Sequence, residues 1–130
     1  MSDISRPGNA GLADGKLRPC PDSPNCVCSE YPGIAHSIAP LSFSGDADAA
    51  WARLISMLNN QPRTTIVEQS EDYTQARVRT RIFRFEDVLE FRLDRAAGQI
   101  HVRSASKVGY SDLGANRRRI ESLRKLFCDS

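Results

Sequence analysis

Residues 88–105 read VLEFRLDRAAGQIHVRSA, and this stretch decides the fold. Its apolar residues alternate with polar ones in two runs, at Leu89, Phe91 and Leu93 and then at Ile100 and Val102. A period of two residues is typical of a strand with one buried face. Between the two runs lies Ala97-Gly98, which favours a turn. The stretch therefore predicts a β-hairpin.

Further elements extend this hairpin towards both ends of the chain. Strands are expected at 64–68, which is short and β-branched, and at 73–82, which alternates. Apolar residues at helical spacing predict one helix from Asp46 to Asn59 and another from Ser111 or Asp112 to Phe127. The fold class is therefore α+β. We expect a two-layer sandwich in which two helices cover one face of an antiparallel sheet of three to five strands.

The chain has the length of a single domain, at 130 residues. Residues 1–16 are predicted to form a disordered or irregular N-terminal arm, and residues 17–130 the α+β domain. Irregular structure is expected to continue to about residue 45, because most of the prolines lie there without a period. No apolar run is long enough to span a bilayer. The sequence also does not start with a basic segment followed by an apolar core, which is the pattern of a secretory signal. We therefore expect a cytoplasmic protein, or a periplasmic or exported one if a signal was removed.

Three cysteines and a histidine lie close together, at Cys20, Cys26, Cys28 and His36, and Cys128 lies near the C-terminus. Thiolate and imidazole are ligands that zinc or copper prefers, yet the spacing matches no standard zinc pattern. A Cys20–Cys26 disulfide fits an exported protein. Reduced structural thiols fit as well. A metal site of Cys20, Cys26 and His36, a disulfide and inert thiols remain open interpretations.

A polar segment, residues 103–119, leads from the end of a strand into the last helix. Free N–H groups at a helix start attract anions, and the segment adds cations and hydroxyls. The candidate ligand-binding residues are Arg103, Ser104, Ser106, Lys107, Tyr110, Ser111, Asp112, Asn116 and Arg117. Simple helix capping by Ser111 and Asp112 is the alternative. Asn116 lies on the apolar stripe of the helix and needs partners, so we expect it to fasten the cysteine-containing arm to the helix.

Arginine also alternates onto the outward face of the predicted sheet. The basic residues there are Arg77, Arg79, Arg81, Arg92, His101 and Arg103. Such a face suits nucleic acid, but stacking aromatics are scarce, and a solvated face with cross-strand ion pairs is the simpler interpretation. Nucleic acid is therefore not the expected partner. Glu86, Asp87 and Glu90 form an acidic cluster without a histidine or nucleophile motif, so the sequence favours no enzyme and no cofactor.

Two motifs resemble a known family: PCPDSPNCV at residues 19–27 and RSASKVGYSDLGANR at residues 103–117. They are similar to the signatures of the domain of unknown function 1499 family, and the likeness extends from Leu17 to Leu126. Cys28 stands where members usually carry serine, and Asp87-Val88 replaces a typical acidic pair. Since some members look exported or lipid-anchored, the resemblance implies a Cys20–Cys26 disulfide.

These observations together predict a non-catalytic binding domain. Its ligand would be an anionic small molecule or an acidic protein segment, bound where the cysteine arm meets the turn before Asn116. Arg103, Lys107 and Arg117 would supply the positive charge. The alternatives are a metal- or thiol-dependent activity at Cys20, Cys26 and His36, and nucleic-acid binding on the arginine-rich sheet face.

Overall fold

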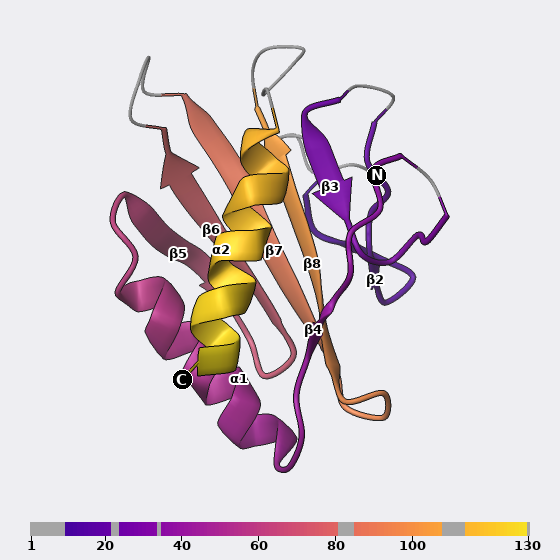
Figure 1. Cartoon of the computed structure of the whole chain (residues 1–130), viewed down its shortest axis with the longest axis vertical. Coiled ribbons are helices and arrows are strands. Elements are labelled where there is room, and N and C mark those ends of the chain that lie inside the picture. Colours follow the sequence, from indigo (N-terminus) through magenta and orange to yellow (C-terminus); the bar gives the residue numbers. More distant parts are fainter. Residues whose placement is uncertain (1–9, 22–23, 34, 81–84, 108–113, 130) are drawn as a thin grey trace.

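The computed structural model describes residues 10–21, 24–33, 35–80, 85–107 and 114–129. Two helices and eight strands follow one another along this part of the chain (Figure 1). Their order is β1 (Leu12–Ala13), β2 (Lys16–Leu17), β3 (Cys26–Cys28), β4 (Leu41–Ser42), α1 (Ala47–Asn59), β5 (Thr64–Gln69), β6 (Tyr73–Arg79), β7 (Glu86–Asp94), β8 (Gln99–Ser106) and α2 (Ala115–Asp129). The predicted α+β class is confirmed.

The main sheet has six of the described strands, which is more than the three to five that the sequence predicts. The order is β3-β8-β7-β6-β5, and β4 also pairs with β8. Every pairing in this sheet is antiparallel. The predicted hairpin is β7–β8, in which Leu93 faces Ile100. β3 and β4 were missed because strands of two or three residues among prolines show no period.

Helix α1 forms where the sequence predicts it, between Asp46 and Asn59. Asp46 caps its start, since the Ala49 N–H donates to Asp46 Oδ2 at 3.0 Å. The start predicted for the second helix, at Ser111 or Asp112, lies outside the described residues. Gly114 has a φ of +80°, a left-handed conformation that cannot lie inside a helix, and α2 begins at the next residue.

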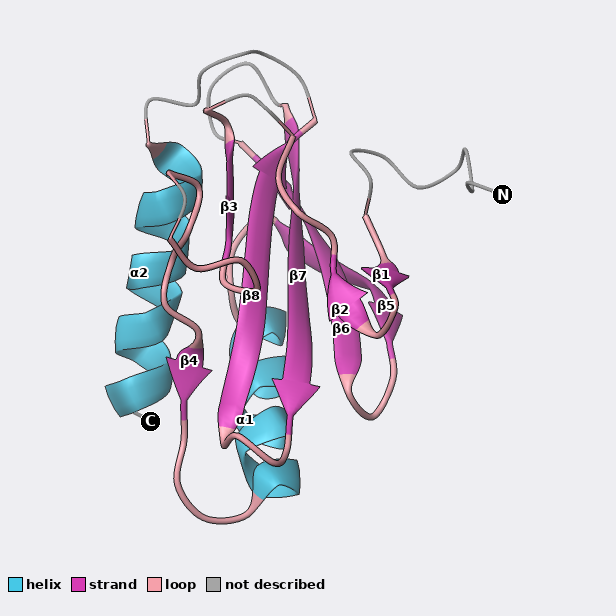
Figure 2. Ribbon diagram, turned by 90° about the vertical axis from the view of Figure 1, so that its right-hand side faces the viewer, coloured by secondary structure: helices cyan, strands magenta, loops and turns pink. Residues whose placement is uncertain are grey.

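The main core lies between the sheet and the helices, which are on one side of it (Figures 1 and 2). Trp51 and Leu54 of α1 and Phe127 of α2 belong to the same buried cluster as Phe91 and Ile100 of the sheet. Burying each such side chain contributes about 1.5–3 kcal/mol, so this layer is the main source of stability.

The opposite face of the sheet is covered by the β1–β2 hairpin (Figure 2). Asp14 and Gly15 both have positive φ, at 53° and 77°, as a two-residue turn of type I′ requires. Leu17 is wholly buried there, in a small cluster with Cys28 and Tyr73. The sequence expectation of an irregular arm did not include this hairpin. Residues 1–9 lie outside the described residues.

Neither described helix combines the length and the apolar character needed to cross a membrane.

Candidate functional site

Asn116 is fully buried and joins α2 to two other parts of the chain. Its Nδ2 donates to the Asn25 carbonyl at 3.0 Å and to Ser106 Oγ at 2.9 Å. Its Oδ1 accepts from Ser104 Oγ at 2.6 Å and from Arg119 at 2.8 Å. The prediction that Asn116 fastens the cysteine arm to the helix is confirmed. Ser104, Ser106 and Asn116 do lie together, but their polar groups are occupied by one another and by protein partners.

Arg103 lies on the other face of the sheet, and its side chain is wholly buried. Its Nη1 donates to Glu90 at 3.2 Å. Glu90 also accepts from the Gly11 N–H at 2.8 Å and from the Tyr73 hydroxyl at 2.7 Å. Burial and the Glu90 carboxylate both raise the pKa of Tyr73. Arg103 is therefore not the exposed charge that the sequence predicts, because residues 10–31 cover the face onto which it alternates.

The remaining predicted site residues lie at the surface or outside the described part of the chain. Lys107 Nζ pairs with Glu86 at 2.9 Å, and this contact lowers the pKa of Glu86. Arg117 donates to the Ala35 carbonyl at 3.2 Å. Tyr110, Ser111 and Asp112 lie outside the described residues, so their part in a site stays a prediction. The structure thus divides the predicted set between two faces of one sheet.

The outward basic sheet face is largely paired and covered. Arg77 pairs with Glu86 at 3.4 Å, and Arg92 Nη2 donates to Glu30 at 3.0 Å. Cross-strand ion pairs are therefore present, but an open face is wrong for Arg92, His101 and Arg103, whose side chains are at most 18% exposed. Arg81 lies outside the described residues.

Cys20 and Cys26 form a disulfide with a Cα–Cα distance of 5.7 Å. Their sulfurs are therefore not thiolates that could bind a metal beside His36. Within the described ranges, no group of three or more His, Cys, Asp or Glu side chains could hold a metal ion. Burial raises the pKa of the free Cys28 thiol to about 11, so Cys28 is poorly nucleophilic at neutral pH.

A second buried polar cluster surrounds His101. Ser29 Oγ accepts from the Val102 N–H at 2.8 Å and lies 2.9 Å from His101 Nδ1. Nε2 of the same ring faces Glu30 at 3.6 Å, which favours the tautomer with its proton on Nε2 and with Nδ1 accepting from the Ser29 hydroxyl. This arrangement contains a hydroxyl, an imidazole and an acid, but Ser29 is only 6% exposed, so the cluster is structural.

The His101 cluster makes stability depend on pH. Burial lowers the pKa of His101 below its ordinary value of 6.5, against the opposing effect of Glu30. The unfolded chain then binds a proton that the folded protein does not, so stability falls as the pH drops below 6.5. We expect His101→Asn, which retains an acceptor for Ser29, to flatten this slope. Urea unfolding at several pH values between neutrality and the titration range of Glu30 measures it; equal slopes would contradict the role of His101.

A hollow of about 170 Å³ lies between the end of α1, the edge of the sheet and α2. We call it the arginine groove. Its lining residues are Leu58, Gln61, Pro62, Arg63, Thr64, Val78, Arg79, Leu89, Arg119, Ser122 and Leu123. Three of them are arginines from three different segments: Arg63 before β5, Arg79 at the end of β6, and Arg119 in α2.

The three arginines are held in different ways. Arg119 forms a fixed wall, because its Nη2 pairs with the buried Asp87 at 2.7 Å while its Nη1 donates to Ser104 and Asn116. Arg63 and Arg79 are exposed, and their backbones are joined by the Arg79 N–H to the Arg63 carbonyl at 2.9 Å. Among the described residues, no acidic side chain pairs with either of them. Within the described part of the chain, the groove therefore carries more positive than negative charge.

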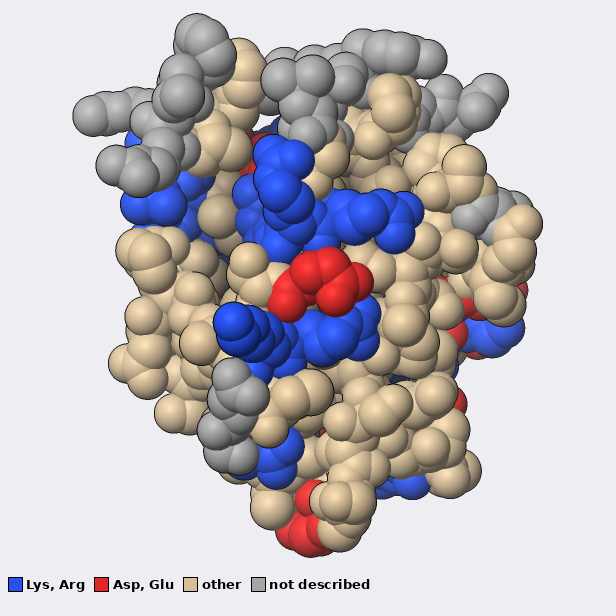
Figure 3. Space-filling view, in the orientation of Figure 1, with Lys and Arg blue, Asp and Glu red and all other residues tan. Residues whose placement is uncertain are grey.

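Cations also gather over α2 beside this groove (Figure 3). Arg117, Arg118 and Lys125 are exposed on that helix, and Glu121 pairs with Arg124. Among the described residues, a basic surface therefore lies on the helical side, which the sequence does not predict.

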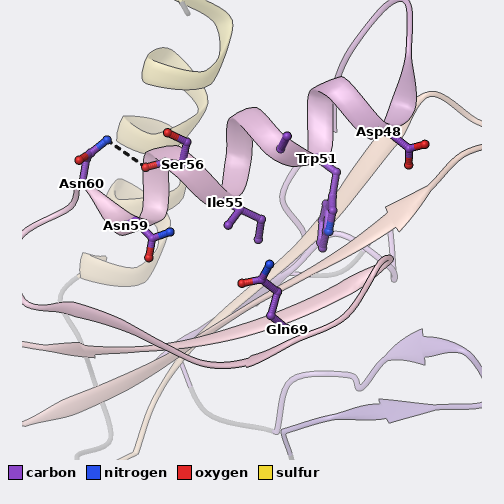
Figure 4. Close-up of a pocket in the computed structure, with 8 residues that line it drawn as sticks. Asp48, Trp51, Ile55, Ser56, Asn59, Asn60 and Gln69 are labelled. Atoms are coloured by element: carbon purple, nitrogen blue, oxygen red, sulfur yellow. Dashed lines mark hydrogen bonds between the residues drawn. The ribbon is translucent and has the colours of Figure 1, made fainter.

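Another hollow, of about 510 Å³, lies on the opposite side of α1, where Trp51, Asn59 and Gln69 line it (Figure 4). An aromatic ring with amides nearby is a combination that can bind a sugar. Trp51, however, is only 7% exposed, and its Nε1 donates to the Ser70 carbonyl at 3.1 Å. Its ring is therefore not available for stacking, and the arginine groove is the better candidate.

The sequence missed the arginine groove for a topological reason. Arg79 was assigned to the sheet face, Arg119 to the last helix and Arg63 to no site. Their proximity depends on the packing of α2 against β8 and α1, which no local pattern encodes. Pro62-Arg63 directly after a helix stop was the one available sign, since a charged residue in a tight turn is often functional.

Comparison with known proteins gives one match. The family model described as "Protein of unknown function (DUF1499)" matches residues 16–127. No curated protein and no solved structure matches the chain. The matched span includes both motifs that resemble this family, the strands of the main sheet and nearly all of α2. The chain therefore belongs to the DUF1499 family.

Proposed function

We propose that this protein is a non-catalytic domain that binds an anionic group in the arginine groove. The observation that carries the proposal is the convergence of Arg63, Arg79 and Arg119 on one hollow. Guanidinium groups bind phosphate and carboxylate through paired N–H donors, so the exposed Arg63 and Arg79, beside the Arg119 wall of a small concave site, suit such an anion. Among the described residues that line the groove, none is acidic, histidine or cysteine, so none offers a general base that would activate the hydroxyls of Thr64 and Ser122.

The backbone of Arg63 supports the same conclusion. Its φ is 55°, in the left-handed region, where a residue other than glycine or asparagine costs about 1 kcal/mol or more. Glycine would fit this turn with less strain. We attribute the presence of arginine at this strained position to the anion-binding role of its guanidinium group in the groove.

The test is Arg63→Gly, with pyrophosphate as the probe and isothermal titration calorimetry as the measurement. We expect the affinity for pyrophosphate to fall by at least tenfold, a loss of about 1.4 kcal/mol. The thermal midpoint should stay the same or rise, because the left-handed turn is relieved. Loss of binding would therefore not be a consequence of unfolding.

Arg117→Ala is the matched control, since it removes an exposed cation that does not line the groove. It should change the affinity by no more than the small long-range effect of one charge. If Arg117→Ala abolishes binding and Arg63→Gly does not, the ligand binds at the turn before α2, as the sequence predicts, and the arginine groove is not the site.

The disulfide bears on where the protein acts. Disulfides persist in oxidising compartments and are rare in the cytoplasm. The Cys20–Cys26 bridge therefore supports the periplasmic or exported alternative over the cytoplasmic expectation. The metal- or thiol-dependent alternative loses two of its three proposed ligands to this bridge. Nucleic-acid binding on the sheet face loses the open surface that it needs.

A further inference from the structure

A third hollow, of about 700 Å³, lies beside the arginine groove, and residues of α1 and Leu126 of α2 line it. We call it the helix groove. Its lining residues are Ala49, Ala52, Arg53, Ser56, Met57, Asn60, Gln61 and Leu126. Gln61 lines both hollows, so they are neighbours on the helical side of the molecule.

The helix groove is mostly apolar, and its α1 wall has short side chains. Ala49, Ala52 and Ser56 follow one another along the exposed face of that helix. Small residues at this spacing let another helix approach to the usual interaxial distance of about 8–10 Å. On the opposite wall Leu126 is 45% exposed and offers an apolar contact to a partner.

The charges around these two hollows select the kind of partner. Lys125 and Arg118 are exposed on α2, and Arg53 lies on the α1 side over the Phe127 ring at 4.6 Å. Arg63 and Arg79 lie at the other end. If a second copy of this chain bound here, two cationic surfaces would face each other, and their electrostatic repulsion disfavours such a dimer. An acidic partner is attracted along the whole length.

We infer that the ligand of this site is an acidic amphipathic helix of another protein. Its apolar side chains would lie in the helix groove and its carboxylates would reach the arginine groove, a mode known for helices that bind in grooves. This inference rests on the proposed function, because it names the source of the anionic group. The observation behind it is that an apolar hollow and a cationic one lie side by side and share Gln61.

The experiment selects binders to the full chain from a displayed library of random peptides of about 16 residues, which suffices for about four helical turns. The expected binders are rich in Glu and Asp, with apolar residues at helical spacing. Ala52→Gln, which fills the groove at an exposed helix position with a good helix former, should weaken these peptides at least tenfold and leave pyrophosphate binding unchanged. Arg63→Gly should weaken both.

The outcomes separate this inference from the proposed function. If pyrophosphate binds but the selected peptides lack acidic residues or still bind Ala52→Gln, the inference is overturned and the proposed function stands. If no peptide is selected and the protein instead sediments with phosphatidylglycerol vesicles, the partner is a lipid surface and the inference is equally wrong. If neither pyrophosphate nor any peptide binds, both fail.

Discussion

Replacing Glu90 with alanine is expected to destabilise the protein by about 3–5 kcal/mol, because it leaves the Arg103 charge buried without its partner. Both side chains are completely inaccessible to solvent, at 0% exposure. The Gly11 N–H and the Tyr73 hydroxyl lose their acceptor in the same step. The free energy of unfolding in urea measures the effect. The N-terminal hairpin should also exchange its amide hydrogens faster, since Glu90 is one of its anchors.

A double variant tests whether the loss comes from the orphaned charge. Glu90→Leu with Arg103→Met replaces the pair by apolar side chains of similar size, an exchange that is often neutral or stabilising for buried ion pairs. We expect it to recover most of the stability lost in Glu90→Ala. If the double variant is as unstable as the single one, the hydrogen bonds to Gly11 and Tyr73, and not the ion pair, dominate the energy of this cluster.

Asn116→Ala should cost about 2–3 kcal/mol, since each buried polar group left without a partner costs about 1–3 kcal/mol. Ser104 loses its acceptor, and the Asn25 carbonyl loses a donor that joins the disulfide-bearing segment to α2. Chemical denaturation gives the loss, and faster proteolysis of residues 18–31 would report that this segment had become detached.

Asn116→Asp is the matched variant, because a carboxylate keeps the acceptor for Ser104 and Arg119 but cannot donate to the Asn25 carbonyl. Its stability should lie between that of the wild type and Asn116→Ala. Ser122→Ala, at an exposed position of the same helix, should be nearly neutral. A loss below about 0.5 kcal/mol for Asn116→Ala would show that water replaces the amide and that the fastening role is wrong.

The parts of the fold with a strong local period were predictable from the sequence. The β7–β8 hairpin has alternating apolar residues and a turn, and α1 has an apolar stripe with a period of 3.6 residues and a cap. Both patterns extend over enough residues to be recognised. Asn116 was identified for a related reason, since an amide on an apolar stripe demands partners wherever the helix packs. The family resemblance was likewise confirmed, because its two motifs are long stretches of contiguous sequence.

The rest depends on contacts between segments far apart in the chain. Arg103 and Leu89 both belong to alternating strands, yet the sequence does not say that residues 10–31 fold back over the face of Arg103 and remove it from solvent. Alternation assigns the residues of a strand to its two faces, but it does not say which segment of the chain covers each face. The arginine groove was missed for the same reason, since Arg63 and Arg119 meet only after two layers have packed.

The pairing of β3 and β4 with β8 also fixes the order in which the chain can fold during synthesis. Cys26 pairs with Ala105, and Leu41 with Ile100, so β3 and β4 have no strand partner until β8 has left the ribosome. Strands β5 to β8, in contrast, follow one another in an antiparallel meander with short connections, which is a topology of low sequence separation. We expect this meander to form first and to serve as the template on which the N-terminal segments close last. The Cys20–Cys26 loop, which is local in the sequence, can be oxidised before that closure.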